Sequence, residues 1–143
     1  LEGSFHGRTL GALSVTGQAS KRAGFDALLP HVRFAQPNDV STLVAAVGDD
    51  TGLILLEPIL GEGGVRPLTS EFLEVAAGFD ALLCLDEVQT GVGRTGTFFA
   101  LEQLGIRPDL VKLAKGLANG LPIVVLMNGG SASAAEIGPR KPL

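Results

Sequence analysis

Three short apolar runs, separated by helical patterns, constrain the fold most strongly. They cover Leu53–Leu56, Ala81–Leu85 and Leu110–Ala114. Each run is nearly continuous and is bounded by Gly, Pro or Asp, which is typical of strands covered on both faces. Alternation of such strands with helices predicts an α/β fold, a mostly parallel sheet with flanking helices and right-handed crossovers.

Three segments around these strands have helical patterns, and each has a residue that can cap or end a helix. They are Val40–Val47 after Asn38 or Asp39, a segment through about Ala77 that Thr69 or Ser70 can cap, and Phe98–Leu104 before Gly105. Leu121–Leu126 is typical of a further strand, although Pro122 weakens its first residues. Residues 128–143 are rich in Gly, Ser, Ala and Pro, so we expect a loose tail there.

Composition excludes several classes of protein. The chain has 143 residues, enough for one domain with a sizeable core, and its 45% hydrophobic content argues against disorder. It has no apolar run of about 18 residues, no signal peptide and no Lys/Arg block, so neither a membrane span nor nucleic acid is expected. Its single cysteine, Cys84, fits a reduced, cytoplasmic setting. His6 and His31 lie far apart and Cys84 has no partner at ligand spacing, so no metal site is predicted.

Polar residues close the expected strands at the edge where parallel sheets bind ligands. Glu57, Asp86 and Lys115 all fall at carboxyl ends of these strands. A carboxylate and an amine held side by side suit pyridoxal phosphate (PLP), because the amine can bond to the aldehyde while the carboxylate keeps the ring nitrogen protonated. Lys112 competes for the role of the amine, but it lies inside the expected strand, so Lys115 is preferred.

Two other segments could contact a ligand. Phe5 could stack on a flat ring, and Arg8 could bind a carboxylate, although a core Phe and a solvated Arg explain that segment more simply when it is taken alone. Glu57 precedes a proline, and Glu62 lies in a glycine-flanked loop; in isolation both could be solvated carboxylates in a turn.

Two nucleotide-binding interpretations of the segment after Asp86 fail. Gly91–Gly96 matches G-x-G-x-x-G, but five residues separate it from the strand and the acidic residue expected about twenty positions later is missing. The run ending in Asp86 and Glu87 is similar to a Walker B strand, yet no G-x-x-x-x-G-K-[ST] occurs in the sequence. Gln89 could instead donate a hydrogen bond to the phenolic oxygen of a PLP ring.

Taken together, these segments resemble the class III (ornithine-type) PLP-dependent aminotransferases of fold type I. The resemblance runs from about Ser4 to Ile123. The matching segments are Ser4–Ala12, Leu56–Ile59, Gly61–Val65, Asp86–Gly91, Gly93–Gly96 and Leu113–Leu117. It implies that residues 1–127 are the central part of the large PLP-binding domain, incomplete at both ends. Leu60 and Val124 depart from the family pattern, where glutamine and glycine are usual.

The resemblance also implies a role for each matching residue. Lys115 would form the Schiff base and carry the proton, and Asp86 would pair with the ring nitrogen. The remaining cofactor contacts would be Phe5, Glu87, Val88 and Gln89, the substrate contacts Arg8 and Glu62, and the supporting residues His6 and Glu57.

The implied reaction is ping-pong transfer of an amino group from N-acetylornithine, or a similar ω-amino acid, to 2-oxoglutarate in arginine biosynthesis, by a cytoplasmic homodimer. Ornithine, succinylornithine and 4-aminobutyrate are alternative donors. A truncated, catalytically inactive remnant is the other alternative, because the family's glycine-rich phosphate cup would precede Leu1 and its threonine loop would follow Leu143.

Overall fold

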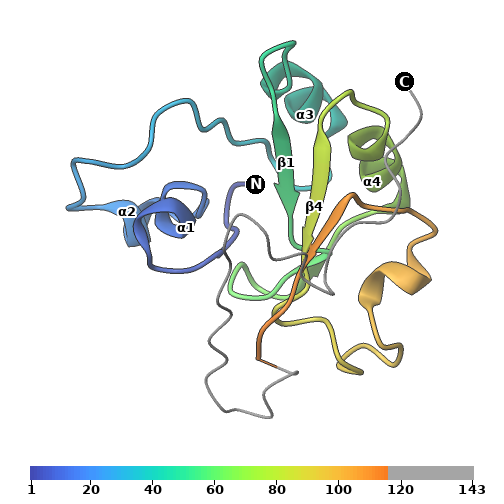
Figure 1. The fold of residues 1–143 in the computed structure, drawn as a ribbon. Coiled ribbons are helices and arrows are strands. Elements are labelled where there is room, and N and C mark those ends of the chain that lie inside the picture. The colour runs from blue at the N-terminus through green and yellow to red at the C-terminus, as the bar shows by residue number, and fades with distance from the viewer. Residues whose placement is uncertain (116–143) are drawn as a thin grey trace, which may run out of the picture.

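A parallel three-stranded sheet forms the centre of the molecule in the computed structural model, which describes residues 1–115. Its strands are β1 (Leu53–Leu56), β4 (Leu82–Asp86) and β5 (Leu110–Lys112), in the order β1-β4-β5. Leu53 pairs with Leu82 across the first ladder, and Asp86 pairs with Lys112 across the second. Figure 1 shows β1 and β4 running side by side in the same direction. The predicted parallel sheet is therefore confirmed.

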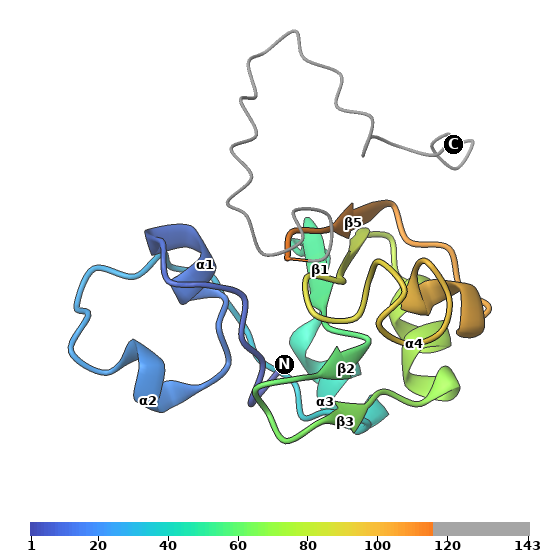
Figure 2. The ribbon, with the colours of Figure 1, turned by 90° about the horizontal axis from the view of Figure 1, so that it is seen from below.

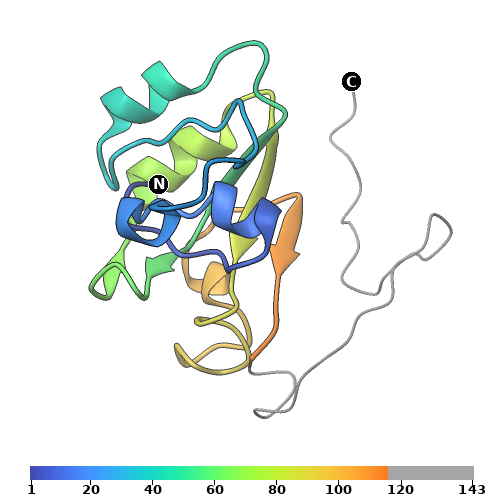
Figure 3. The same ribbon diagram turned by 90° about the vertical axis from the view of Figure 1, so that its left-hand side faces the viewer.

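One face of the sheet carries the hydrophobic core. Side chains alternate between the two faces of a strand, so Ile54 and Leu56 point the same way as Leu83 and Leu85. Helices α3 (Val40–Ala46) and α4 (Ser70–Ala77) cover this face (Figure 3), and Phe72, at 0% exposure, is in the same buried cluster. The apolar spacing of the helices and the alternation of the strands thus bury one continuous core.

Both helices begin where their capping residues predict. The Asp39 carboxylate accepts hydrogen bonds from the backbone amides of Ser41 (3.0 Å) and Thr42 (3.2 Å). The Thr69 hydroxyl accepts one from the amide of Phe72 at 3.3 Å. These side chains satisfy amides that lack a partner within the helix, which fixes where each helix starts.

The opposite face of the sheet is more open and carries the polar strand ends. Leu53 and Leu82 are about half exposed there, whereas Cys84 is buried. Asp86 follows Cys84 on this face, and Lys112 lies opposite Asp86 in the ladder. The register therefore brings an acid and an amine together at the carboxyl edge of the sheet.

Two predicted elements differ from the structure. The helix predicted over Phe98–Leu104 is wrong in type and length, because Ala100–Gln103 form a shorter 3-10 helix, η1. It starts where the Glu87 carboxylate accepts hydrogen bonds from the amides of Ala100 and Leu101. The third strand ends at Lys112 and not at Ala114. Since β4 ends at Asp86, the residues after Lys112 have no neighbouring strand with which to pair.

Four short elements were not predicted. Helices α1 (Leu10–Ser14) and α2 (Ala19–Arg22) lie together at one side of the sheet (Figure 2). Strands β2 (Ile59–Leu60) and β3 (Arg66–Pro67) pair antiparallel around the glycine-rich loop. The predicted strand Leu121–Leu126 and the tail 128–143 lie outside the described residues. Among residues 1–115, no helix is both long and apolar enough to span a bilayer.

Candidate active site

A buried carboxylate, Asp86, lies at the centre of the polar strand ends. It is 4% exposed and closes β4. Its Oδ2 accepts hydrogen bonds from His6 Nδ1 at 2.8 Å and from Lys112 Nζ at 2.7 Å, and its Oδ1 accepts one from the amide of Val88 at 3.2 Å. His6 and Lys112, from two distant parts of the chain, thus converge on one acid.

Its surroundings keep Asp86 ionised at neutral pH. Burial acts to raise the pKa of this carboxyl group, but the hydrogen bonds and charges of His6 and Lys112 outweigh burial and hold the pKa below the ordinary value of 3.8. An ionised carboxylate can only accept hydrogen bonds, so His6 Nδ1 carries the proton of that contact. The site therefore offers a buried anion that can pair with a cationic ligand group.

His6 is held firmly beside this acid. His6 is 5% exposed, and its backbone amide donates to the Thr16 hydroxyl at 3.0 Å. The Thr16 hydroxyl in turn donates to the carbonyl of Ala12 at 2.9 Å, which ties His6 to α1. His6 Nε2 is buried and has no hydrogen-bond partner among residues 1–115. The supporting role predicted for His6 fits this position.

Lys112, and not Lys115, is the lysine whose amine contacts Asp86. Lys112 Nζ also donates to the carbonyl of His6 at 2.7 Å, and its side chain is 40% exposed. Lys115 lies in the turn that follows β5 and is exposed. Sequence reasoning missed the partnership of Lys112, because it depends on the register of β4 and β5. The covalent role assigned to Lys115 stays a prediction.

Glu57 joins the amino-terminal segment to the glycine-rich loop. It is 3% exposed, and it accepts hydrogen bonds from the amides of Phe5 (2.8 Å) and Gly61 (3.2 Å). Burial raises the pKa of Glu57 in spite of these two hydrogen bonds. A Cβ atom at Gly61 would lie 2.4 Å from Gln89 Oε1, so a larger residue there would displace the amide end of the Gln89 side chain. Glu57, predicted as a support, thus positions Phe5 and the turn against which Gln89 packs.

Glu87 holds a loop together. The residue is 1% exposed, and its carboxylate accepts hydrogen bonds from the Thr90 hydroxyl (3.1 Å) and from the amides of Ala100 (2.7 Å) and Leu101 (2.9 Å). The sequence did not indicate this structural role, because the partners lie up to 14 residues away in irregular structure. The cofactor contact assigned to Glu87 stays a prediction.

The other predicted contacts make fewer hydrogen bonds among residues 1–115. Phe5, Val88 and Gln89 are half-buried. Arg8 and Glu62 are exposed, and neither takes part in an ion pair within residues 1–115.

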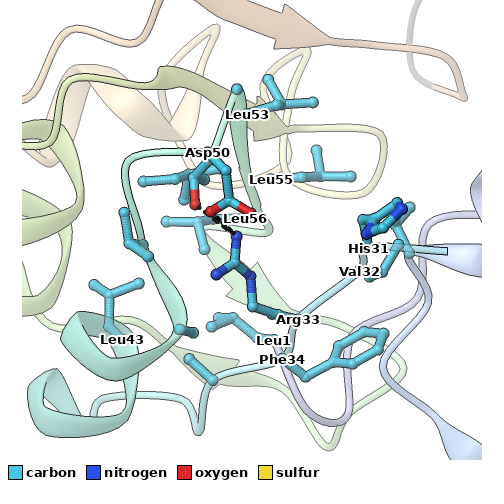
Figure 4. A pocket seen from close by; sticks show the side chains of 17 residues that line it. Leu1, His31, Val32, Arg33, Phe34, Leu43, Asp50, Leu53, Leu55 and Leu56 are labelled. Atoms are coloured by element: carbon cyan, nitrogen blue, oxygen red, sulfur yellow. Dashed lines mark hydrogen bonds and ion pairs between the residues drawn. The ribbon is translucent and has the colours of Figure 1, made fainter.

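A separate cavity of about 300 Å³ lies along β1, between this strand, α3 and the segment 31–35. Figure 4 shows Arg33 reaching across it to an ion pair with Asp50. None of the predicted site residues lines this cavity. Within the described part of the chain, no group of three or more His, Cys, Asp or Glu side chains could hold a metal ion.

Comparison with known sequences gives one consistent result. The model of the aminotransferase class III family matches residues 1–134. An acetylornithine aminotransferase from Mycolicibacterium smegmatis is 54% identical over 126 residues, which are 85% of this chain and 32% of the relative. Another from Listeria monocytogenes is 46% identical over 138 residues, 94% of this chain and 36% of the relative. The chain thus spans about a third of the length of the curated relatives it matches.

Solved structures agree with the sequence comparison. One is an ornithine aminotransferase from Toxoplasma gondii, with PLP at partial occupancy in its active site. The match has a TM-score of 0.76 and 31% sequence identity, and it covers 85% of this chain and 30% of the Toxoplasma chain. An N-acetylornithine aminotransferase from Stenotrophomonas maltophilia matches 63% of this chain and 26% of its own at a TM-score of 0.60 and 47% identity. These neighbours are PLP-dependent enzymes of fold type I, which confirms the predicted fold class. With its parallel sheet, its family match and these relatives, the chain belongs to the class III aminotransferases.

Proposed function

We propose that the protein carrying this chain is a PLP-dependent transaminase that moves an amino group from N-acetylornithine, or a similar ω-amino acid, to 2-oxoglutarate. The observation that supports it best is the buried, ionised Asp86 at the carboxyl edge of a parallel sheet, next to the strand that leads to Lys115. The names of the most similar relatives favour acetylornithine as the donor and arginine biosynthesis as the pathway. A cytoplasmic homodimer is part of the same proposal.

The residues at the site fit PLP. Asp86 already holds a cation, the Lys112 ammonium, at 2.7 Å, so its chemistry suits a protonated ring nitrogen. Half-buried Phe5 and Val88 supply apolar surface, and the side-chain amide of Gln89 lies against Gly61. When bound, PLP supplies the electron sink that makes amino-group transfer possible.

The chain's own residues would divide the remaining work. Asp86 keeps a proton on the ring nitrogen, and His6 keeps the Asp86 carboxylate oriented through Nδ1. The Lys115 amine would bond to the cofactor aldehyde and would carry the proton that moves during amino-group transfer. Exposed Arg8 would bind a substrate carboxylate. Glu62 would pair with an arginine of the C-terminal domain when the substrate has no second carboxylate.

Steady-state kinetics of the complete polypeptide that contains this sequence test the proposal. We expect PLP-dependent transfer to 2-oxoglutarate with the highest kcat/KM for N-acetylornithine among N-acetylornithine, ornithine, succinylornithine and 4-aminobutyrate. Lys115→Ala should lose at least about a thousandfold in kcat, because it removes the proton carrier. A different preferred donor would correct the substrate. No PLP binding and no transfer with any donor would favour the inactive remnant.

A further inference from the structure

We propose that Lys112 competes with the ring nitrogen of the cofactor for Asp86: its ammonium holds the acid in the empty site and must withdraw when PLP binds. The inference rests on the proposed function. It gives Lys112 a positioning role that neither the sequence pattern nor the comparisons indicate. It concerns the affinity of the site for PLP and the withdrawal of Lys112 from Asp86 when PLP binds. It thereby adds to the proposed reaction.

The geometry puts Lys112 in direct contact with the acid. Asp86 and Lys112 are paired across β4 and β5, so their side chains leave the same face of the sheet. Lys112 Nζ lies 2.7 Å from Asp86 Oδ2, the oxygen that also accepts from His6 Nδ1. Asp86 Oδ1 accepts from the amide of Val88. A ring N–H would therefore meet a carboxylate whose two oxygens already accept three hydrogen bonds.

Charge makes sharing unfavourable. The Lys112 ammonium and a protonated ring nitrogen are both cations, and the Asp86 side chain is 3% exposed, so water screens their mutual repulsion only weakly. One carboxylate then has to balance two positive charges in a site of low polarity. When either the Lys112 ammonium or the protonated ring nitrogen withdraws, Asp86 and the remaining cation form a pair without net charge.

The two partners differ in their freedom to move. The Asp86 side chain is buried and fixed by His6 and Val88, whereas the side chain of Lys112 is 40% exposed and carries its charge on a flexible four-carbon stem. Lys112 can hydrate its ammonium after leaving, but Asp86 cannot reach water. We therefore expect Lys112 to be the group that moves.

Neutral replacements of Lys112 should have opposite effects on the empty and the loaded protein. Lys112→Met removes the charge and keeps the length of the side chain. The empty variant should melt at a lower temperature, because a buried carboxylate loses a partner. It should bind PLP about tenfold more tightly, since ring binding no longer breaks an ion pair of moderate strength. A lysine that serves only the fold would lower stability without raising affinity.

The experiment measures the Kd of PLP by titration and the Tm of the empty form, using the complete polypeptide. Lys112→Arg, which keeps the charge, should bind PLP like the wild type. Lys21→Met, the same charge change on α2, should alter neither quantity. Lys112→Gln is a second neutral variant and keeps a donor for the carbonyl of His6.

The results distinguish a failure of the proposed competition from a failure of the proposed function. If the wild type and Lys21→Met bind PLP while Lys112→Met and Lys112→Gln bind it with equal or lower affinity, the competition is refuted and the transaminase proposal stands. If no variant binds PLP, the proposed function itself fails. Failure of both neutral variants to fold at saturating PLP would also refute the competition, because bound cofactor should replace the lost partner of Asp86.

Discussion

Replacing Glu87 by glutamine should destabilise the protein strongly, because the Glu87 carboxylate holds the loop that leads into η1. It accepts three hydrogen bonds at 2.7–3.1 Å, two of them from the backbone amides of Ala100 and Leu101. Glutamine keeps one acceptor oxygen, but its NH₂ group faces one of these two backbone amides, which then lacks an acceptor.

The magnitude follows from these contacts. A hydrogen bond to a charged group contributes about 1.5–3 kcal/mol, and a buried donor left unpaired costs a similar amount. Glu87→Gln loses one such bond and leaves one buried amide facing a donor. We therefore expect the free energy of unfolding to fall by about 2–4 kcal/mol, and Glu87→Ala to cost more because both amides lose their partner.

Urea unfolding of the empty protein measures this loss. Glu102→Gln is the matched control, since that exposed carboxylate accepts one hydrogen bond, from the amide of Phe99 at 2.7 Å, and its loss should cost about 1 kcal/mol or less. The reasoning is refuted if Glu87→Gln unfolds within about 0.5 kcal/mol of the wild type. If Glu87→Gln kept its stability but lost affinity for PLP, Glu87 would instead be the cofactor contact that the family resemblance implies.

Three further predictions concern the titratable groups. The pKa of Asp86 lies below 3.8 in the folded state, so its contribution to stability is full above that pH and is lost as the pH falls further; Asp86→Asn should flatten the curve of Tm against pH in that acid range. The pKa of Glu57 is raised above 4.5, so the folded state binds this proton more tightly and stability falls as the pH rises through the raised pKa. Glu57→Gln should remove that fall, and an unchanged slope would contradict the burial of Glu57. Burial raises the pKa of the Cys84 thiol from 9.0 to about 11, so alkylation by iodoacetamide at pH 8 should be at least about a hundredfold slower in the folded protein than in urea; equal rates would show an accessible thiolate.

The regular elements were predictable because local patterns specify them. The apolar run Leu53–Leu56 became a strand with the predicted bounds, and Asp39 and Thr69 cap helices where their side chains can reach free amides. A helix was predicted over Phe98–Leu104, but its 3-10 type and its start at Ala100 were not, because the start depends on Glu87, which lies 13 residues before Ala100. Local periodicity carries no information about such a contact.

The site was predictable in its parts and not in its connections. Asp86, Glu57 and His6 were identified from their places at strand ends and in motifs, and the structure brings Asp86 and His6 within 2.8 Å. The partner of Asp86 was not predictable, because the choice of Lys112 depends on which residue of β5 faces Asp86 in the ladder. A shift of one residue would have turned Lys112 to the other face.

Borohydride reduction of the PLP-loaded complete polypeptide tests the central claim most directly, because it fixes the cofactor to the amine that holds it. Peptide mapping by mass spectrometry then locates the modified residue. We predict modification at Lys115, with Lys112, the lysine beside Asp86, unmodified. Modification of Lys112 in place of Lys115, or of no lysine in this chain, would contradict the account.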